Sequence, residues 1–319
     1  MKNLIEKAIE INNLTKIYNK HVVVDHINLT VMKGEIISLL GPNGAGKSTT
    51  INILTTILKP NEGTALLNNK DVTIDSSIIK SCIGVVPQEY VFYEDLTAEE
   101  NLIFFGLMHG IPKSILKKDA KTILSKLGLN NRKDKTKNFS GGMKRRLNIA
   151  IALIMKPDIY FLDEPTAGLD PQSKYVVWES IKELKNRGKT VILCTHDMHE
   201  AEVLSDRVII MNNGSIIAEG SSNELKRKYG EIYSLEIIFK EKENIYEFEN
   251  RIKSLPYLKR TFIDSNNKIN LFFDGGMIEF VKIIQDSLIG DIGDIESMTF
   301  RETTLEDVFL NLTGRRLKE

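Results

Sequence analysis

A glycine-rich segment at residues 41–49 constrains this chain more than any other part of its sequence. The segment fits the pattern Gly-x-x-x-x-Gly-Lys-Ser/Thr, and its residues are Gly41, Pro42, Asn43, Gly44, Ala45, Gly46, Lys47, Ser48 and Thr49. An apolar run at 35–40 precedes it and a helix-like run at 51–58 follows it, as a phosphate-binding loop between a strand and a helix requires. Glycines permit the tight turn, and amide groups at the positive end of a helix attract phosphate. A plain glycine turn is the alternative, and it is disfavoured because motif and context are both complete.

Two side chains at the start of the predicted helix suit a nucleoside triphosphate. Lys47 is expected to reach the β- and γ-phosphates, and the hydroxyl of Ser48 is expected to coordinate Mg²⁺. The backbone amides of residues 43–48 are expected to hold the same phosphates. This segment alone predicts a nucleotide site and little more.

Two adjacent acids follow a second apolar run. Residues 159–162 have the pattern of a buried parallel strand, which leads into Asp163 and Glu164. Asp163 is suited to hold Mg²⁺, usually through water, and Glu164 is suited to activate the attacking water. A solvated turn is the alternative, and it is disfavoured because residues 165–170 continue the segment as Pro-Thr-Ala-Gly-Leu-Asp.

A serine and two glycines precede a third, helix-like run at 145–155. Ser140, Gly141 and Gly142 would form a second anion-binding nest at the start of that helix. One nucleotide does not need two nests from the same chain, so the economical explanation is a dimer in which each nest closes on the partner's ATP. A capping serine followed by flexible glycines is the alternative.

At these segments the sequence resembles the ATP-binding cassette of ABC transporters, over about residues 8–222. The segments match the family's phosphate loop, its signature segment and the end of its Walker B strand. Four further residues match the remaining motifs in the family's order: Tyr18 the aromatic that stacks on adenine, Gln88 the Q-loop, Asp170 the D-loop and His196 the switch histidine.

The resemblance implies a role for each matched residue. It implies that Gln88 and Ser48 both coordinate Mg²⁺ directly, and that Asp163 acts on the ion from the second coordination shell. It also implies that His196 contacts the γ-phosphate or orients Glu164. The expected catalytic residues are Glu164, His196 and Lys47. The expected metal site consists of Ser48, Gln88 and Asp163. Outside the phosphate loop, the residues expected to bind ATP are Tyr18, Gln88, Ser140, Gly141, Gly142 and Asp170.

Two positions depart from the family's pattern, and one basic run needs an explanation. Phe139 replaces the usual leucine before the signature serine, and Gly168 replaces a frequent alanine of the D-loop; both are interpreted as packing variation. The run at 144–146, Lys-Arg-Arg, is interpreted as a solvated helix face. Nucleic acid is not an expected partner, because 43 basic and 43 acidic residues leave no net charge.

The resemblance also implies an α/β fold of the P-loop NTPase class. An ABC cassette is expected at 1–222, with an antiparallel β subdomain and a helical subdomain at about 94–156 that docks on a membrane partner. Tyr93, Phe104 and Phe105 are candidates for that contact, and ordinary helix core is the alternative for each.

Residues 231–319 have the pattern of a second, small α+β unit. Strand and helix patterns alternate as strand-helix-strand-strand-helix-strand, with the second helix at 277–286, which suggests a ferredoxin-like split βαβ fold. The unit contains no catalytic constellation, and a role in stabilising or regulating a dimer is our hypothesis. Its tail at 303–314 resembles the end of cassettes that serve ABC-2-type exporters of the daunorubicin drug-resistance group.

The sequence contains no uninterrupted apolar stretch of about 18 residues, so the chain is expected to span no membrane. The expected protein is a peripheral ATPase on the cytoplasmic side of the cell membrane, as a homodimer or in a heterodimer with a second cassette. Its expected partner is a separate ABC-2-type permease that exports an unidentified substrate.

A soluble ABC ATPase that acts on ribosomes or in DNA repair is the alternative. Ribosome-acting relatives typically carry two cassettes in one chain, and repair relatives interrupt the cassette with a long coiled coil. This chain has one cassette and no long heptad insertion, so the exporter subunit is the favoured interpretation.

Overall fold

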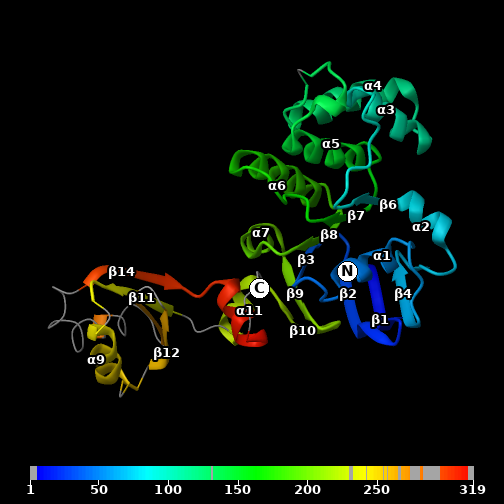
Figure 1. Cartoon of the computed structure of the whole chain (residues 1–319). Helices are drawn as coiled ribbons and strands as arrows, with labels where there is room; N and C mark the ends of the chain where they lie inside the picture. The colour runs from blue at the N-terminus through cyan, green and yellow to red at the C-terminus, as the bar shows by residue number, and fades with distance from the viewer. Residues whose placement is uncertain are drawn as a thin grey trace, which may run out of the picture. The chain divides into compact units, whose positions relative to one another are not determined.

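Two compact units make up the chain in this computed structural model, Met1–Ser221 and Ser222–Glu319 (Figure 1). The structure describes residues 6–130, 132–229, 233–241, 243–253, 255, 256, 258–264, 267–273, 281, 282 and 295–314. None of the helices in these ranges is both long enough and apolar enough to cross a lipid bilayer.

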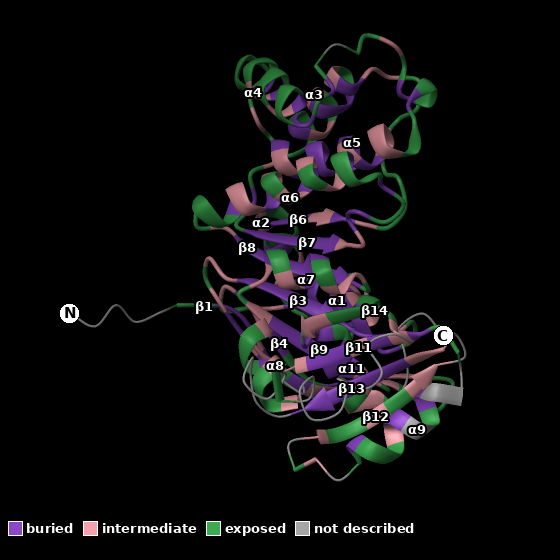
Figure 2. Cartoon of the chain, turned by 90° about the vertical axis from the view of Figure 1, so that its left-hand side faces the viewer, coloured by how far each residue is buried: buried purple, intermediate pink, exposed green. Residues whose placement is uncertain are grey.

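A six-stranded sheet forms the centre of the first unit, in the order β10-β9-β3-β8-β7-β6 (Figure 1). Its strands are β3 (Ile36–Leu40), β6 (Ile83–Val86), β7 (Ile159–Asp163), β8 (Thr190–Thr195), β9 (Arg207–Asn212) and β10 (Ser215–Gly220). The neighbouring strands are parallel, except that β10 runs antiparallel to β9. All residues of β3 and β8 are buried, which explains their predominantly apolar sequences (Figure 2).

The two faces of this sheet pack against different elements. Ile37 and Leu39 belong to an apolar cluster shared with helix α1 (Lys47–Leu54) and with a second, antiparallel sheet. Ile36, on the opposite face, belongs to a cluster shared with α5 (Gly141–Ile154) and α6 (Pro171–Asn186). The sheet is therefore a layer buried between these elements, with the phosphate-loop segment 41–49 following the end of β3.

The antiparallel sheet has the order β2-β1-β4-β5. Its strands are β1 (Lys7–Tyr18), β2 (His21–Met32), β4 (Glu62–Leu67) and β5 (Lys70–Asp71). A two-residue turn joins β1 to β2, and both of its residues, Asn19 and Lys20, have positive φ angles, as a tight hairpin requires. Asn213 and Gly214 make the same kind of turn between β9 and β10, as an Asn-Gly step favours.

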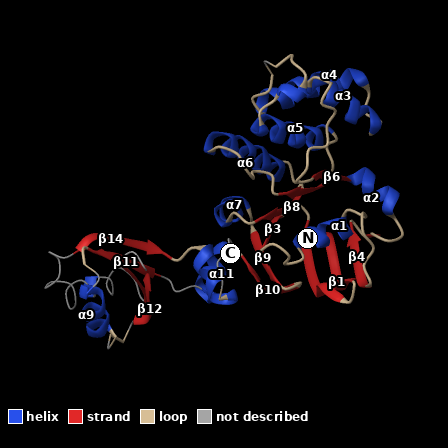
Figure 3. Ribbon diagram, viewed as in Figure 1, coloured by secondary structure: helices blue, strands red, loops and turns tan. Residues whose placement is uncertain are grey.

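Residues 94–156 are mostly helical, as predicted, and Figure 3 shows their helices together in blue. They contain α3 (Ala98–Met108), α4 (Lys113–Lys126), the 3₁₀ turn η1 (Thr136–Asn138) and α5. Helix α3 begins with a capping box, in which the Thr97 hydroxyl accepts from the amide of Glu100 and the Glu100 carboxylate accepts from the amide of Thr97. Two short helices complete the unit, α2 (Ser76–Cys82) and α7 (Met198–Leu204).

The helix after the phosphate loop is shorter than predicted. It ends at Leu54 instead of continuing to Leu58. Thr56 adopts a φ of 64°, and the amides of Thr56 and Ile57 donate to the carbonyl groups of Ile53 and Asn52. This pattern closes a helix in a Schellman motif, and the usual glycine signal is missing because a threonine takes the left-handed position.

The second unit contains a four-stranded antiparallel sheet in the order β12-β13-β11-β14. Its elements are α8 (Ser222–Tyr229), β11 (Tyr233–Phe239), α9 (Glu243–Ile252), β12 (Leu258–Asp264), β13 (Lys268–Phe273), β14 (Ile295–Glu302) and α11 (Leu305–Thr313). Strands β11 and β12 are parallel with β13 between them, which is the arrangement of a split βαβ unit. The helix predicted at 277–286 lies outside the described residues except for 281 and 282.

Helix α11 packs against α8, and both belong to the second unit. Asn311 Nδ2 donates to the carbonyl oxygen of Tyr229 at 3.0 Å. Thr304 and Asp307 form a capping box at the start of α11, and Arg301 pairs with the same aspartate at 2.8 Å. The bond from Asn311 and the packing of α11 on α8 join residues 222–229 to the C-terminal tail.

Candidate active site

The glycine-rich segment 41–49 forms the loop between β3 and α1. Lys47 is buried, and its Nζ donates to the carbonyl oxygens of Gly41 at 2.6 Å and Pro42 at 3.0 Å. Gly46 has a φ of 100°, and a Cβ there would lie 2.6 Å from the carbonyl oxygen of Val23, so only glycine fits. The loop thus combines a buried cation with the positive start of a helix, the combination that suits phosphate.

Asp163 lies at the end of β7, next to the phosphate loop. The hydroxyl of Ser48 and the charge of Lys47 both favour the ionised form of its carboxylate. Burial and the adjacent charge of Glu164 nevertheless raise the pKa of Asp163 above its ordinary value. A half-buried carboxylate beside a hydroxyl group is a donor set that hard cations such as Mg²⁺ prefer.

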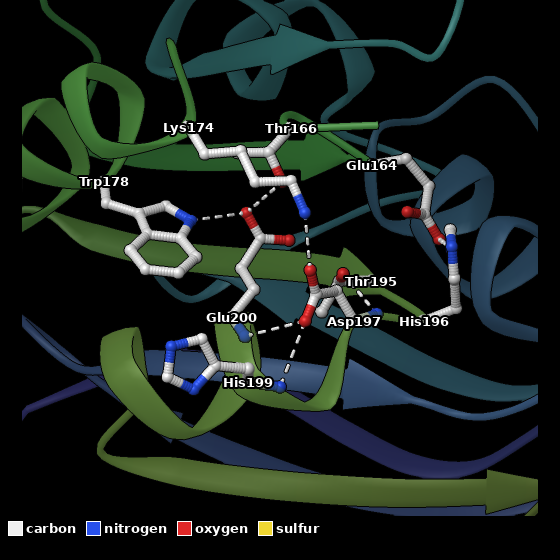
Figure 4. Close-up of polar contacts among 9 residues, drawn as sticks. All are labelled: Glu164, Thr166, Lys174, Trp178, Thr195, His196, Asp197, His199 and Glu200. Carbon is white, nitrogen blue, oxygen red and sulfur yellow. Dashed lines mark hydrogen bonds and ion pairs between the residues drawn. The ribbon is translucent and has the colours of Figure 1, made fainter. Parts of the chain in front are cut away.

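Glu164 follows Asp163 with a backbone φ of 51°, an uncommon conformation for a residue with a side chain. Its amide donates to the carbonyl oxygen of Cys194 at 2.9 Å, which ties it to strand β8. Its carboxylate lies 2.8 Å from Nδ1 of His196, which follows β8 (Figure 4). The structure therefore brings the predicted base and the predicted switch histidine into direct contact.

Asp197 fixes the segment that carries His196. Its carboxylate accepts from the amides of His199 and Glu200 and caps helix α7. Lys174 from α6 pairs with the same carboxylate at 2.8 Å (Figure 4). These hydrogen bonds lower the pKa of Asp197 despite its burial.

Glu200 is a fully buried carboxylate in this network that the sequence interpretation missed. Its Oε1 accepts from the Thr166 hydroxyl at 2.8 Å and from the Trp178 indole at 3.0 Å (Figure 4). Burial raises the pKa of Glu200 above its ordinary value. In the sequence it looks like any acid in the first turn of a helix, so no local signal reveals its burial.

The signature residues lie at the start of α5. Ser140 caps the helix, because its hydroxyl accepts from the amide of Met143 at 3.3 Å. Ser140 and Gly141 are exposed, whereas Gly142 is half-buried near Leu169 and Ser173. The serine is therefore a helix cap, and the two exposed residues remain open to an external anion.

The other predicted contacts are exposed. Tyr18 ends β1 with 40% of its surface exposed, and Nζ of Lys16 lies 5.2 Å from its ring centroid. Gln88 is exposed, and its carbonyl oxygen is bonded within the chain. Asp170 caps α6 by accepting from the amide of Ser173 at 2.9 Å, and these hydrogen bonds lower its pKa.

One of the two departures from the family pattern has a different cause from the one expected. Phe139 is buried in the apolar cluster of the helical part, which agrees with packing variation. Gly168, in contrast, has a φ of 72°, and a Cβ there would meet nothing within 4 Å. Packing variation is therefore the wrong explanation for Gly168, where backbone conformation favours glycine.

The interpretation of the basic run as a solvated face is wrong for Arg145. Only 4% of its surface is exposed, and its guanidinium donates to three backbone carbonyl oxygens. Two of them belong to Pro87 and Gln88, and the third belongs to Glu164. The helical period that places this residue inward is obscured by its charged neighbours.

Comparison with known proteins gives a consistent result. A family model described as ABC transporter matches residues 24–167. The chain is 37% identical to the linearmycin resistance ATP-binding protein LnrL of Bacillus subtilis, over 98% of this chain and the whole of that protein. It is 36% identical to the daunorubicin/doxorubicin resistance ATP-binding protein DrrA of Streptomyces peucetius, over 97% of this chain and 93% of that protein.

Solved structures agree with these relatives. The ATP-binding subunit of an ABC transporter superposes with a TM-score of 0.65 and 30% identity, over 70% of this chain and 93% of that one. The dimeric cassette MJ0796, in a post-hydrolysis state with ADP and phosphate, superposes with a TM-score of 0.62 and 29% identity, over 67% of this chain and 98% of that one.

Proposed function

The chain belongs to the family of ABC transporter ATP-binding proteins, which hydrolyse ATP to drive transport, and we propose that it powers drug export through a separate membrane permease. The contact between Glu164 and His196 carries the hydrolytic part of this proposal, and the resemblance to LnrL and DrrA carries the part on export. That contact is an arrangement for moving a proton next to a bound triphosphate.

ATP binds with its phosphates on the amides of residues 43–48 and on Lys47 in this proposal. Nζ of Lys47 already lies within the loop, on the carbonyl oxygens of Gly41 and Pro42. Tyr18 stacks on the adenine with the ring face that Lys16 leaves open.

The Ser48 hydroxyl and the Gln88 side chain would hold Mg²⁺, and Asp163 would act on it through water. The effect of the Ser48 hydroxyl on the Asp163 carboxylate supports this assignment, because it indicates that the two side chains are neighbours. The ion supplies charge neutralisation at the phosphate oxygens.

Glu164 accepts a proton from the water that attacks the γ-phosphate. His196 holds the Glu164 carboxylate through Nδ1. The opposite edge of its ring, which carries Nε2, contacts the γ-phosphate. Phosphoryl transfer depends on positioning and on charge neutralisation, so these two side chains need accurate placement more than strong basicity.

Two chains, as a homodimer or a heterodimer with a second cassette, enclose two ATP molecules. Ser140 and Gly141 of one chain reach the γ-phosphate bound by the other, which their exposure permits. Asp170 lies on the segment that follows Glu164 and contributes to the same interface. The dimeric assembly of the related cassette MJ0796 supports this arrangement.

An aromatic group on the helical part is the surface for the permease. Tyr93 is 53% exposed and Phe104 is 36% exposed, and their rings meet edge to face with centroids 4.8 Å apart. Phe105 is half-buried beneath them, with its centroid 5.4 Å from that of Phe104. Exposed aromatic clusters of this kind are typical of protein contacts. The partner is an ABC-2-type permease, which places this chain on the cytoplasmic side of the cell membrane.

The second unit, 231–319 by sequence pattern, stabilises or regulates the dimer. Among the residues described for it, no group of three or more His, Cys, Asp or Glu side chains is placed to hold a metal ion. The names of LnrL and DrrA point to drugs as the exported substrates of relatives, and a drug is the proposed cargo here.

Affinity purification from detergent-solubilised membranes tests this proposal. A co-purifying multi-span protein, together with faster ATP hydrolysis in the eluate, is the expected result. The alternative is a soluble ATPase acting on ribosomes or in DNA repair. Recovery of ribosomes or DNA in place of a membrane protein would support that alternative and contradict the export proposal.

A further inference from the structure

Arg145 connects three segments of the site although no sequence motif assigns it a role. It lies on α5, five residues after the signature serine, Ser140, and is almost completely buried. Its Nη1 donates to the carbonyl oxygens of Pro87 at 3.1 Å and Gln88 at 2.8 Å, and its Nη2 donates to that of Glu164 at 2.6 Å.

The bond to Glu164 matters because the backbone of that residue is unusual. A positive φ at a residue with a side chain persists only where the surroundings fix the backbone on several sides. The Glu164 amide is fixed by Cys194, and its carbonyl is fixed by Arg145. The direction of the Glu164 carboxylate, and so its contact with His196, follows from this backbone conformation.

We propose that Arg145 is a positioning residue that sets the backbone of Glu164 and couples it to the Gln88 loop and to the signature helix. This inference rests on the proposed function, since it assigns Arg145 to the geometry of the same hydrolytic site. Any movement of the Gln88 loop or of α5 would change the same guanidinium contacts that hold Glu164. The carboxylate is therefore aligned only when these segments are in place.

The three bonds need an arginine. A planar guanidinium presents several N–H groups in a fixed fork, whereas a lysine ammonium is a compact charge on a flexible stem. Three carboxylates act on this cation, those of Glu164, Asp163 and Glu200. A lysine would keep the charge but lose the simultaneous contact with both segments.

The next residue provides a matched control. Arg146 also donates to backbone carbonyl oxygens, those of Gly142 at 3.3 Å and Leu127 at 2.9 Å, and both lie in the helical part. Substitutions of the two arginines remove similar numbers of bonds from the same helix. Only the substitutions at Arg145 remove a contact with Glu164.

The first experiment compares Arg145→Gln and Arg145→Lys with Arg146→Gln and Arg146→Lys in the full chain. The comparison uses variants whose thermal unfolding midpoints are equal, so that differences in stability do not affect it. We expect both Arg145 variants to lose about 10- to 100-fold in kcat, with the KM for ATP changed less than about threefold. The Arg146 variants should keep kcat within about threefold. Equal kcat losses at the two positions, or rescue by Arg145→Lys, would overturn the proposal.

Combination with Glu164→Gln shows whether Arg145 acts through Glu164. In that background, single-turnover hydrolysis should change less than about threefold when Arg145→Gln is added, because the group being positioned is already gone. A further loss as large as that in the wild-type background would contradict the positioning role.

Hydrogen exchange tests the coupling without any need for turnover. Arg145→Lys should accelerate exchange in both 87–90 and 164–167, whereas Arg146→Lys should accelerate it around 127–129. Unchanged exchange in either of the first two segments would overturn the inference even if the wild-type chain hydrolysed no ATP. Normal wild-type hydrolysis combined with normal Arg145 variants would instead leave the proposed function standing and reject this inference alone.

Discussion

The Nδ1 atom of His196 lies 2.8 Å from Oε1 of Glu164, and each residue directly follows one of two neighbouring parallel strands. The two side chains are separated by 31 residues of chain but are brought together because the carboxyl ends of parallel strands lie at one edge of a sheet. This contact links the proposed general base to the residue proposed to sense the γ-phosphate.

Replacement of His196 should impair hydrolysis more than replacement of its neighbour. His196→Ala removes the partner of the Glu164 carboxylate, so kcat should fall about 10- to 100-fold. His199→Ala removes a ring that packs edge-on to Trp178, with centroids 5.4 Å apart, and kcat should stay within about threefold. Steady-state ATPase assays of the two variants check this prediction, and equal losses would contradict it.

A carboxylate at Gly141 should prevent dimerisation without unfolding the chain. A Cβ at Gly141 would meet only the hydroxyl of Tyr90, at an ordinary 3.7 Å, and an acid suits the first turn of a helix. In the proposed dimer, Gly141→Asp would nevertheless face the partner's ATP with a negative charge. Analytical ultracentrifugation with ATP, in a Glu164→Gln background, should show a monomer, whereas the exposed control Lys113→Asp at the start of α4 should still dimerise.

Buried Glu200 should make stability depend on pH. Burial raises the pKa of Glu200 in the folded state above the ordinary value of 4.5. Between pH 4.5 and this raised pKa, the folded state therefore binds more protons than the unfolded state. Stability attributable to Glu200 is therefore greatest below pH 4.5 and is lost as the pH rises through the folded pKa. Glu200→Gln keeps an acceptor for Thr166 and Trp178 and removes this loss.

Urea unfolding from pH 4.5 to 8 measures the effect. The stability of Glu200→Gln relative to the wild type should increase as the pH rises, and the exposed control Glu179→Gln should show no such trend. Parallel stability curves for Glu200→Gln and the wild type would show that Glu200 does not titrate in this range.

The position of a truncation should decide whether the cassette fragment resists proteolysis. Helix α8 buries Leu225 and packs against α11, so a chain that ends at Tyr229 leaves this short helix without its partner. Exposing such a leucine costs about 1.5–3 kcal/mol, and an eight-residue helix is marginal alone. Limited proteolysis should cut 222–229 in that fragment but not in the full chain. A fragment ending at Ser221 should resist cleavage, and altered dimerisation or turnover in it would support a regulatory second unit.

Much of this site is predictable from sequence because its residues follow strands or begin helices. The phosphate loop, Asp163 and Glu164 each lie at the end of a strand, and an apolar run in the sequence predicts that strand. The capping box at Thr97 depends only on residues within one helical turn. The turn at Asn213 is similarly encoded by two residues that tolerate a positive φ.

Contacts that depend on distant segments are not predictable in this way. Arg145 looks like part of a charged surface, and its burial follows only from carbonyl groups 19 and 57–58 residues away in the chain. Glu200 looks like an ordinary helical acid in the sequence, and its burial depends on Thr166 and Trp178, which are distant in the chain. The early end of α1 at Leu54 was missed because Thr56 replaces the expected glycine.

The most direct test of the whole account is ATP turnover by Glu164→Gln, measured together with ATP binding. The amide keeps the shape of the side chain but is a far weaker base, so turnover should fall by about 10²–10⁴ while the Kd for ATP stays within about threefold. Near-normal turnover in this variant would remove Glu164 from the role of base and contradict the proposed mechanism.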